Sequence, residues 1–226
     1  MQTINIAIDG PSGAGKSTIA RKAAALLSYR YIDTGALYRT VGYHMWKQGI
    51  GLEDTRGFVE HLPEIQVDLE YRDGTQRVLL NGEDVSEKIR TPEISMYASA
   101  VSAVPEVRQM LLGMQQEMAK RYDVIMDGRD IGTVVLPQAQ IKIFLTADVE
   151  DRARRRWEEL RLKDASIRLE DVVADMIQRD KQDSSRAIAP LKPAPDAILL
   201  NTTGNTLEQS VQLVLNTIKE RLNHVV

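Results

Sequence analysis

The 226-residue sequence contains no cysteine. Disulfide bonds and thiol catalysis are therefore excluded, and we expect a protein that works in a reducing compartment. No apolar run approaches the roughly 20 residues that a membrane-spanning helix requires. The first five residues lack the basic stretch and the apolar core of a signal peptide. These absences predict a cytoplasmic protein without a membrane partner.

An excess of basic residues is also missing. Lysine and arginine number 29 against 32 aspartate and glutamate, which gives a formal net charge of −3. A chain with this balance is not expected to bind nucleic acid over a broad surface. Any site for an anion must therefore be built locally.

Short apolar runs alternate with helical stretches, a pattern typical of a parallel sheet with helices on its faces. The expected strands are apolar almost throughout, as strands covered on both faces usually are. They occupy residues 4–8, 29–32, 123–126, 141–145 and 197–200. A final helix at about 206–223 would bury one apolar stripe, formed by Leu207, Val211, Val214, Ile218 and Leu222.

Residues 65–85 break this rhythm, because Asp73-Gly74 and Asn81-Gly82 are strong hairpin signals. We therefore expect a small antiparallel sheet inserted into the α/β body. After it, Thr91-Pro92-Glu93 predicts the capped start of a helix. Pro105 predicts the start of another helix, which runs to about residue 121.

A glycine-rich motif lies between the first expected strand and a helical stretch at residues 18–27. Its sequence is Gly10-Pro11-Ser12-Gly13-Ala14-Gly15-Lys16-Ser17, followed by Thr18. Such a loop directs backbone N–H groups at phosphates, with the positive end of the helix behind them. Lys16 would reach the β- and γ-phosphates, and the Ser17 hydroxyl would ligate Mg²⁺. The motif predicts binding of a purine nucleoside triphosphate, MgATP, by residues 10–18.

The segment Asp127-Gly128-Arg129-Asp130 separates the classes of phosphate-loop protein. A mechanical ATPase would carry a glutamate here to activate water, and a GTPase would carry an Asn-Lys-x-Asp motif, which is absent. An arginine at this place suits an anionic acceptor, so we expect a kinase. Arg39 also follows a strand end, and further basic residues crowd the later helices: Arg152, Arg154, Arg155, Arg156, Arg161, Arg168, Arg179 and Arg186.

Several stretches together resemble the bacterial cytidylate kinases, of the nucleoside monophosphate kinase superfamily. Besides residues 8–17 they are Asp33-Thr34-Gly35-Ala36-Leu37-Tyr38-Arg39, Gly82-Glu83-Asp84-Val85-Ser86, Ile89-Arg90-Thr91, Asp127-Gly128-Arg129-Asp130-Ile131-Gly132-Thr133, and Arg179-Asp180 with Asp183, Arg186 and Ala189-Pro190-Leu191. The resemblance implies a five-stranded parallel sheet wrapped by helices, the P-loop nucleoside monophosphate kinase fold. Its core would be residues 1–36, 104–150 and 187–226, with a monophosphate-binding insert at 37–103 and a helical lid at 151–186.

The resemblance also implies transfer of the γ-phosphoryl group of ATP to CMP or dCMP, giving ADP and CDP or dCDP, by a monomer. Arg39 and Arg129 would hold the acceptor phosphate. Ser99, Arg108 and Asp130 would read cytosine. Arg179 and Asp183, with Thr34 and Tyr38, would hold the ribose. Arg152, Arg155 and Arg156 would close over ATP, and Arg186 would stabilise phosphate charge.

Two alternatives and one detail stay open at this point. Another small anion, such as AMP, UMP or shikimate, could be the acceptor. In a different class, the chain would be a nucleotide-binding regulator or an RNA-associated ATPase without an acceptor. Ligation of Mg²⁺ beyond Ser17 is also open, because Asp127 could act directly or through water.

Overall fold

The computed structural model describes residues 3–72, 75–162 and 164–225, which form two compact units. The first unit comprises Met1–Tyr31 and Tyr122–Val226, and the second comprises Ile32–Arg121. Within these described ranges, no helix combines the length and the apolarity needed to cross a membrane.

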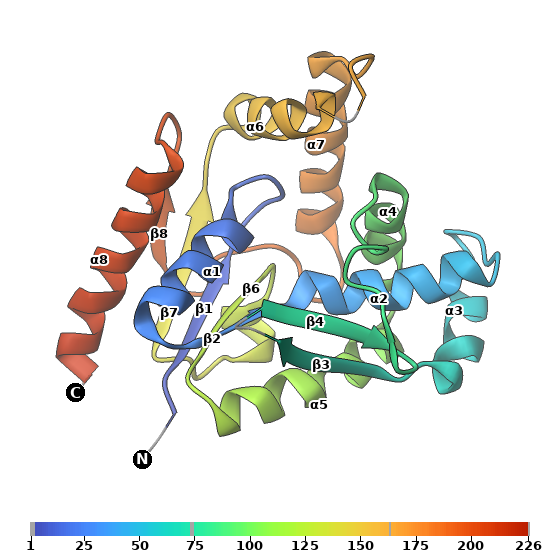
Figure 1. The fold of residues 1–226 in the computed structure, drawn as a ribbon, viewed down its shortest axis with the longest axis horizontal. Helices are drawn as coiled ribbons and strands as arrows, with labels where there is room; N and C mark the ends of the chain where they lie inside the picture. The colour runs from blue at the N-terminus through green and yellow to red at the C-terminus, as the bar shows by residue number, and fades with distance from the viewer. Residues whose placement is uncertain (1–2, 73–74, 163, 226) are drawn as a thin grey trace. The chain divides into compact units, whose positions relative to one another are not determined.

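A five-stranded parallel sheet organises the first unit (Figure 1). Its order is β2 (Arg30–Asp33), β6 (Val124–Gly128), β1 (Asn5–Asp9), β7 (Ile141–Thr146) and β8 (Ile198–Asn201). The central strand β1 pairs in parallel with β6 and β7, so Ile6 lies beside Ile125 and Ile141. These three side chains are buried. All five strands expected from the apolar runs are present, and the fold class is confirmed.

Two helices of the first unit, α1 (Lys16–Leu27) and α8 (Leu207–Val225), pack together beside the sheet (Figure 1). Val211, Val214 and Ile218 of α8 join the apolar cluster of the strands, as predicted. Leu207 does not, since its side chain is 38% exposed. It is the first residue of the helix, one turn before the stripe reaches the cluster. Its assignment to the core was wrong.

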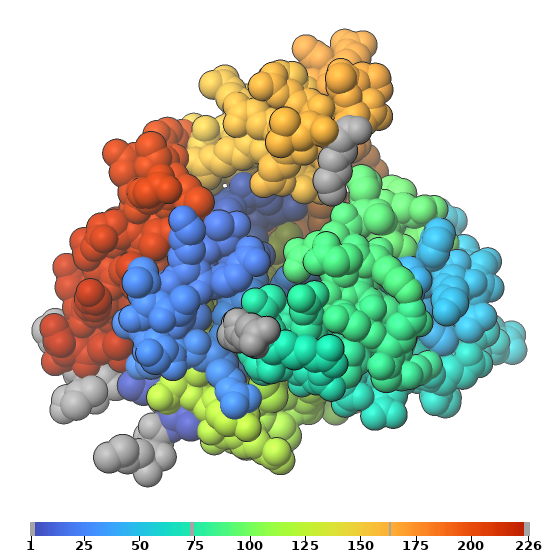
Figure 2. Space-filling view, in the orientation of Figure 1, coloured from blue at the N-terminus to red at the C-terminus, as the bar shows by residue number. Residues whose placement is uncertain are grey.

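The helices α6 (Val149–Arg161) and α7 (Leu169–Ser185) form a pair within the first unit. They share a small apolar cluster of Ala153, Val172 and Met176, against which Trp157 packs. Figure 2 shows their atoms, in yellow and orange, gathered into one group. Apart from the first two residues of α6, this pair falls in the interval 151–186 expected to form the lid.

The second unit combines helices with a three-stranded antiparallel sheet. Its helices are α2 (Thr34–Lys47), α3 (Thr55–His61), the short 3₁₀ turn η1 (Leu62–Glu64), α4 (Pro92–Val101) and α5 (Pro105–Arg121). Its strands are β3 (Val67–Arg72), β4 (Thr75–Leu80) and β5 (Glu83–Asp84). The turn at Asn81 and Gly82 has φ values of 51° and 82°, as the sequence predicts. Asp73-Gly74 lies outside the described residues.

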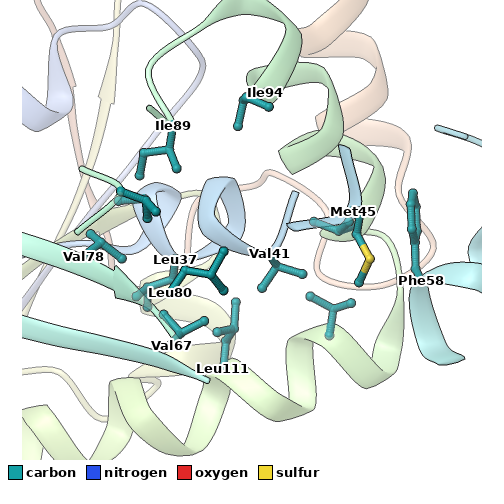
Figure 3. Close-up of a cluster of buried hydrophobic side chains, with 14 of the residues drawn as sticks. Leu37, Val41, Met45, Phe58, Val67, Val78, Leu80, Ile89, Ile94 and Leu111 are labelled. Atoms are coloured by element: carbon teal, nitrogen blue, oxygen red, sulfur yellow. The ribbon is translucent and has the colours of Figure 1, made fainter. Parts of the chain in front are cut away.

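Apolar side chains from α2, α5 and the small sheet meet in the core of the second unit (Figure 3). Leu37 and Val41 come from α2, Val78 from β4, and Val107 and Leu111 from α5. Because α5 completes this core, the unit extends beyond the interval 37–103 expected for the insert. The predicted start of α4 is confirmed, since the Thr91 hydroxyl accepts a hydrogen bond from the Ile94 amide at 3.1 Å.

Candidate active site

The phosphate loop joins β1 to α1, as the sequence predicts. Gly10 has a φ of 148°, and a Cβ atom there would lie 1.9 Å from the Leu145 carbonyl oxygen. Gly13 has a φ of 74°, and a Cβ atom there would lie 2.7 Å from the Met176 side chain. Gly10 therefore requires glycine, because the backbone oxygen cannot move away, and Gly13 favours glycine chiefly through its positive φ. The loop can approach β7 and α7 closely only because these side chains are missing.

Lys16 is buried in the first unit, and its Nζ donates to the Pro11 carbonyl oxygen at 2.6 Å. Burial lowers the pKa of Lys16 well below 10.5, and the positive charge of Arg129 lowers it further. The negative charges of Asp127, Asp9 and Asp183 oppose this shift. Because burial disfavours the charged form of Lys16, a negatively charged ligand in the glycine-rich loop would stabilise that charged form strongly.

Asp127 lies near the end of β6 and is 4% exposed. Its Oδ2 accepts a hydrogen bond from the Ser17 hydroxyl at 2.8 Å, and its Oδ1 accepts one from the Tyr31 hydroxyl at 2.8 Å. Hydroxyl and carboxylate oxygens are the ligands that Mg²⁺ takes in phosphate-loop sites. Within the described ranges, no group of three or more His, Cys, Asp or Glu side chains could hold a metal alone.

Asp9 ends β1 immediately before the phosphate loop, and it is buried. Its two carboxylate oxygens accept from the backbone amides of Ile131, at 2.8 Å, and Gly132, at 2.7 Å. They hold the start of a π-helical turn, Ile131–Val135, which directly follows Asp130. Burial raises the pKa of Asp9 to about 6, and the negative charge of Asp130 also raises it. Asp9 thus fixes the backbone next to a predicted substrate-binding residue.

A third buried carboxylate, Asp183 of α7, pairs with arginines in the first unit. Arg129 Nε donates to Asp183 Oδ2 at 2.8 Å, and Arg186 donates to Asp183 Oδ1. Burial raises the pKa of Asp183, but the charges of Arg129 and Arg186 outweigh it and lower the pKa overall, and Arg179 adds to them. Three guanidinium groups thus act on one carboxylate. The positive charge of Arg129 also lowers the pKa of Lys16, which connects this cluster with the phosphate loop.

Arg152, expected to contact ATP, binds protein atoms. Its guanidinium donates to the carbonyl oxygens of Ala147 at 2.8 Å and Ser12 at 2.9 Å, and to Asp180 Oδ2 at 2.7 Å. These bonds tie α6 to the phosphate loop and to α7. The other carboxylate oxygen of Asp180 is buried and has no hydrogen-bond partner among the described residues.

Two further lid arginines differ in their surroundings. Arg155 donates to Asp151, and also to the carbonyl oxygens of Thr202 at 2.8 Å and Asn205 at 3.4 Å, so it braces the turn that precedes α8. Arg156 is 39% exposed and pairs with Glu159. Contacts of both residues with ATP stay predictions.

The second unit contains the other predicted substrate-binding residues. Asp33 caps α2 by accepting from the Ala36 amide at 2.8 Å, and it also accepts from Arg39 Nη2 at 2.8 Å. Arg39 Nε is buried and has no hydrogen-bond partner among the described residues. A buried guanidinium N–H without an acceptor is costly, which makes Arg39 a candidate for binding an anion.

The candidate nucleoside-binding residues of the second unit lie on α2, α4 and α5. Thr34 is buried at the start of α2. Arg108 is buried in α5, donates to the Ser102 carbonyl oxygen at 3.3 Å, and lies 5.7 Å from the centre of the Tyr38 ring. Ser99 lies on α4 and is half-buried.

A buried lysine in a glycine-rich loop, with arginines beside it and no water-activating glutamate, defines a P-loop phosphotransferase of the kinase class. The comparisons with known proteins identify the family. Residues 6–220 match the family model described as cytidylate kinase. This chain belongs to the cytidylate kinase family, and it is a nucleoside monophosphate kinase.

Its relatives agree over nearly the full length. A cytidylate kinase of Caldicellulosiruptor bescii is 51% identical over 215 residues, which cover 95% of each chain. A cytidylate kinase of Caldanaerobacter subterraneus subsp. tengcongensis is 50% identical over 218 residues, 96% of each chain. In structure, the chain resembles an uncharacterized protein from Eubacterium ventriosum with a TM-score of 0.55 at 12% identity, over 97% of this chain and 99% of the other. That likeness concerns the fold alone.

Sequence reasoning assigned no role to three side chains that hold site residues in place. Asp9, Tyr31 and Asp180 were not singled out, although each contacts a predicted site residue or its immediate backbone. Asp9 and Asp127 share one usable signal, an aspartate directly after an apolar strand. Asp180 stands in a stretch that carries the family resemblance, Arg179-Asp180, whereas Tyr31 carries no comparable signal.

Proposed function

We propose that the chain transfers the γ-phosphoryl group of MgATP to CMP or dCMP, giving ADP and CDP or dCDP. The observation that carries the proposal is the cationic cluster of the first unit. There the phosphate-loop lysine, Lys16, lies near Arg129, and Arg129 shares the carboxylate of Asp183 with Arg186. Membership in the cytidylate kinase family supports the same reaction.

The donor triphosphate would be held by residues 10–18. Amides of the loop bind phosphate oxygens, and Lys16 neutralises the β- and γ-phosphates. Arg152, Arg155 and Arg156 are proposed to join the lid over ATP. A lid is needed because water would otherwise compete for the γ-phosphoryl group.

Ser17 and Asp127 would hold Mg²⁺, Ser17 through its hydroxyl and Asp127 directly or through water. When bound, Mg²⁺ neutralises charge on the β- and γ-phosphates and orients them. Both groups are oxygen donors and lie within hydrogen-bond distance of each other, so they suit this ion.

The acceptor nucleophile would be a phosphate oxygen of the monophosphate. Its second pKa is near 6, so it is largely dianionic at pH 7 and needs no general base. The difficulty is the approach of two polyanions, which positive charge overcomes. Arg39 and Arg129 are proposed to hold the acceptor phosphate, and Arg186 to stabilise the transferring group. Forked guanidinium groups also fix the direction of attack.

Base choice would follow from hydrogen-bond polarity. Cytosine offers an exocyclic amine as donor and N3 as acceptor, whereas uracil reverses both. Asp130 is proposed to accept from the amine, and Arg108 to donate to N3 or O2, with Ser99 beside them. Arg179, Asp183, Thr34 and Tyr38 are proposed to hold the ribose. Opposed acceptors in a closed site would reject UMP.

The decisive test is a coupled ADP-release assay with CMP, dCMP, UMP, AMP, shikimate and no acceptor. We expect the first two to support turnover far above that with water. A preference for AMP, UMP or shikimate would replace the acceptor, and turnover indifferent to every acceptor would leave only an ATPase or a regulator. In the same assay, Asp130→Ala should narrow the ratio of CMP to UMP turnover. An unchanged ratio would remove Asp130 from base recognition.

We also infer a cytoplasmic monomer that binds no nucleic acid. The absence of cysteine, the net charge of −3 and the small size of both substrates support this inference. Sedimentation equilibrium would test the monomer, and a fluorescence titration with single-stranded RNA would test the absence of nucleic-acid binding.

A further inference from the structure

Tyr31 is the last residue of the first unit and lies in β2. Its hydroxyl donates to one carboxylate oxygen of Asp127 at 2.8 Å, while the other oxygen accepts from Ser17 at 2.8 Å. We propose that Tyr31 is a positioning residue for Ser17 and Asp127, the pair proposed to hold Mg²⁺. Its hydroxyl keeps the Asp127 carboxylate in the orientation that accepts a hydrogen bond from the Ser17 hydroxyl. The inference rests on the proposed function, and specifically on the Mg²⁺ site formed by Ser17 and Asp127.

The physical reason lies in the freedom of a carboxylate. The terminal torsion of an aspartate is broad and roughly two-fold, so a single donor does not fix the plane of the group. Donors on both oxygens do fix it, and here the donors come from separate elements, β2 and α1. Asp127 is buried, so water does not readily replace a lost donor. Removal of the Tyr31 hydroxyl would therefore let the carboxylate turn.

The orientation of Asp127 matters because of what a hydroxyl must do as a metal ligand. Ser17 can offer an oxygen lone pair to a cation while its proton is donated elsewhere, and Asp127 Oδ2 is the acceptor in this structure. Groups that orient metal ligands through hydrogen bonds typically change metal affinity or activity by about 10–100-fold. Tyr31 would thus act on the metal through Asp127, without touching either substrate.

The chain offers a matched control for the phenol group. Tyr29 lies two residues before Tyr31, and both side chains pack partly buried against the same apolar cluster. Burial raises the pKa of Tyr29, and the negative charge of Asp123 raises it further. The phenol that donates to Asp127 Oδ1 is that of Tyr31. Tyr29→Phe and Tyr31→Phe therefore remove the same atom from similar surroundings and keep both rings.

The experiment compares the affinity for AMPPNP in excess Mg²⁺ with that in EDTA, by isothermal titration calorimetry. In the wild-type chain we expect tighter binding with Mg²⁺. Tyr31→Phe should weaken the Mg²⁺-dependent binding by about ten-fold and leave the affinity in EDTA unchanged. Tyr29→Phe should retain both affinities.

In steady-state kinetics, Tyr31→Phe should raise KM for MgATP and leave KM for CMP unchanged. In an Asp127→Ala background, which lacks both carboxylate oxygens, Tyr31→Phe should have no further effect.

The other outcomes distinguish a failure of the positioning role from a failure of the proposed metal site. A Tyr31→Phe chain with wild-type affinities in both conditions would overturn the positioning role. Equal weakening in Mg²⁺ and EDTA would overturn it as well, because the phenol would then support the fold and not the metal. A wild-type chain whose affinity does not respond to Mg²⁺ would overturn the metal site of the proposed function itself, whatever the variants do.

Discussion

Each unit buries an apolar cluster, but among the described residues the first unit buries more ionisable side chains than the second. The first unit buries ionisable groups where β1 and β6 end, with Asp9, Lys16 and Asp127 each at most 5% exposed. The second unit buries a broad apolar cluster around α2 (Figure 3), in which Leu37 and Phe58 are fully buried. Burial of apolar groups stabilises a fold, whereas burial of charge costs free energy unless a partner compensates.

The comparison suggests a division of physical roles. In the first unit, the pKa of Lys16 falls because burial and Arg129 disfavour its charge, so the folded chain holds a group that favours an anion. In the second unit, the apolar core supports Arg39 and Arg108, each of which donates hydrogen bonds to the protein. Substitutions of the buried ionisable residues of the first unit should therefore have their largest effect on activity. Substitutions in the apolar core of the second unit should have their largest effect on stability.

The largest effect is expected for Lys16→Met. The variant keeps an apolar stem of similar length and removes the ammonium, so kcat should fall by about 10²–10³-fold or more. The free energy of unfolding should not fall, because burial already disfavours the charge of Lys16. Coupled kinetics and urea unfolding test both statements. A strongly destabilised but active variant would reverse the comparison.

The next largest effect is expected for Leu37→Ala. This side chain is fully buried in the second unit, so the cavity should cost about 2–5 kcal/mol of unfolding free energy. Leu26→Ala is the matched control, because Leu26 is 67% exposed and its loss should cost less than about 0.5 kcal/mol. Urea unfolding can follow Trp46 of α2 alone if both variants carry Trp157→Phe. Equal losses for the two leucines would contradict the prediction.

A smaller effect, dependent on pH, is expected at Asp9. Its pKa in the folded chain is raised from 3.8 to about 6, so the folded state binds the proton more tightly than the unfolded state. The free energy of unfolding should therefore fall as pH rises between those values, by roughly 3 kcal/mol. The side chain of Asp9→Asn does not titrate. The difference in unfolding free energy between wild type and variant should therefore fall as pH rises over this range. Parallel stability curves for the two chains between pH 4 and 6 would refute the assignment.

The smallest effect is expected for Arg56→Ala. Arg56 pairs with Glu60 at 2.7 Å on the surface of the second unit, but the side chains are 87% and 57% exposed. Such pairs contribute about 0–1 kcal/mol, and salt weakens them. Thermal unfolding at low and high salt should show a change near the error of measurement. A large loss would mean that the second unit depends on charge as the first does.

The sequence predicted the parallel sheet well because its strands are covered on both faces and read as continuous apolar runs. The edge strand β8 shows the limit of that signal, since Leu199 is apolar yet 64% exposed. The hairpin turn at Asn81-Gly82 was predictable because its backbone has positive φ values that these residues tolerate. The helix α2 was not predicted, although Asp33 caps it in the way that starts many helices.

The phosphate loop and the strand-end arginines were found because their signals are local. The supporting contacts are not local: Asp9 binds the backbone 122 residues later, and Tyr31 binds a side chain 96 residues later. No spacing rule in a single sequence connects such positions. The roles assigned to the arginines rest on family resemblance, and the assays above test them.

The proposed contact of Arg152 with ATP would be an exchange of hydrogen-bond acceptors. Its guanidinium already serves three protein acceptors, and the carboxylate of Asp180 shares it while a second oxygen of that carboxylate stays unsatisfied. An ATP molecule that bound the Arg152 guanidinium would have to replace those three acceptors. The Asp180 carboxylate would then lose its cationic partner. The free energy of the proposed contact would then be the difference between two states, one in which protein oxygens accept from Arg152 and one in which ATP oxygens do.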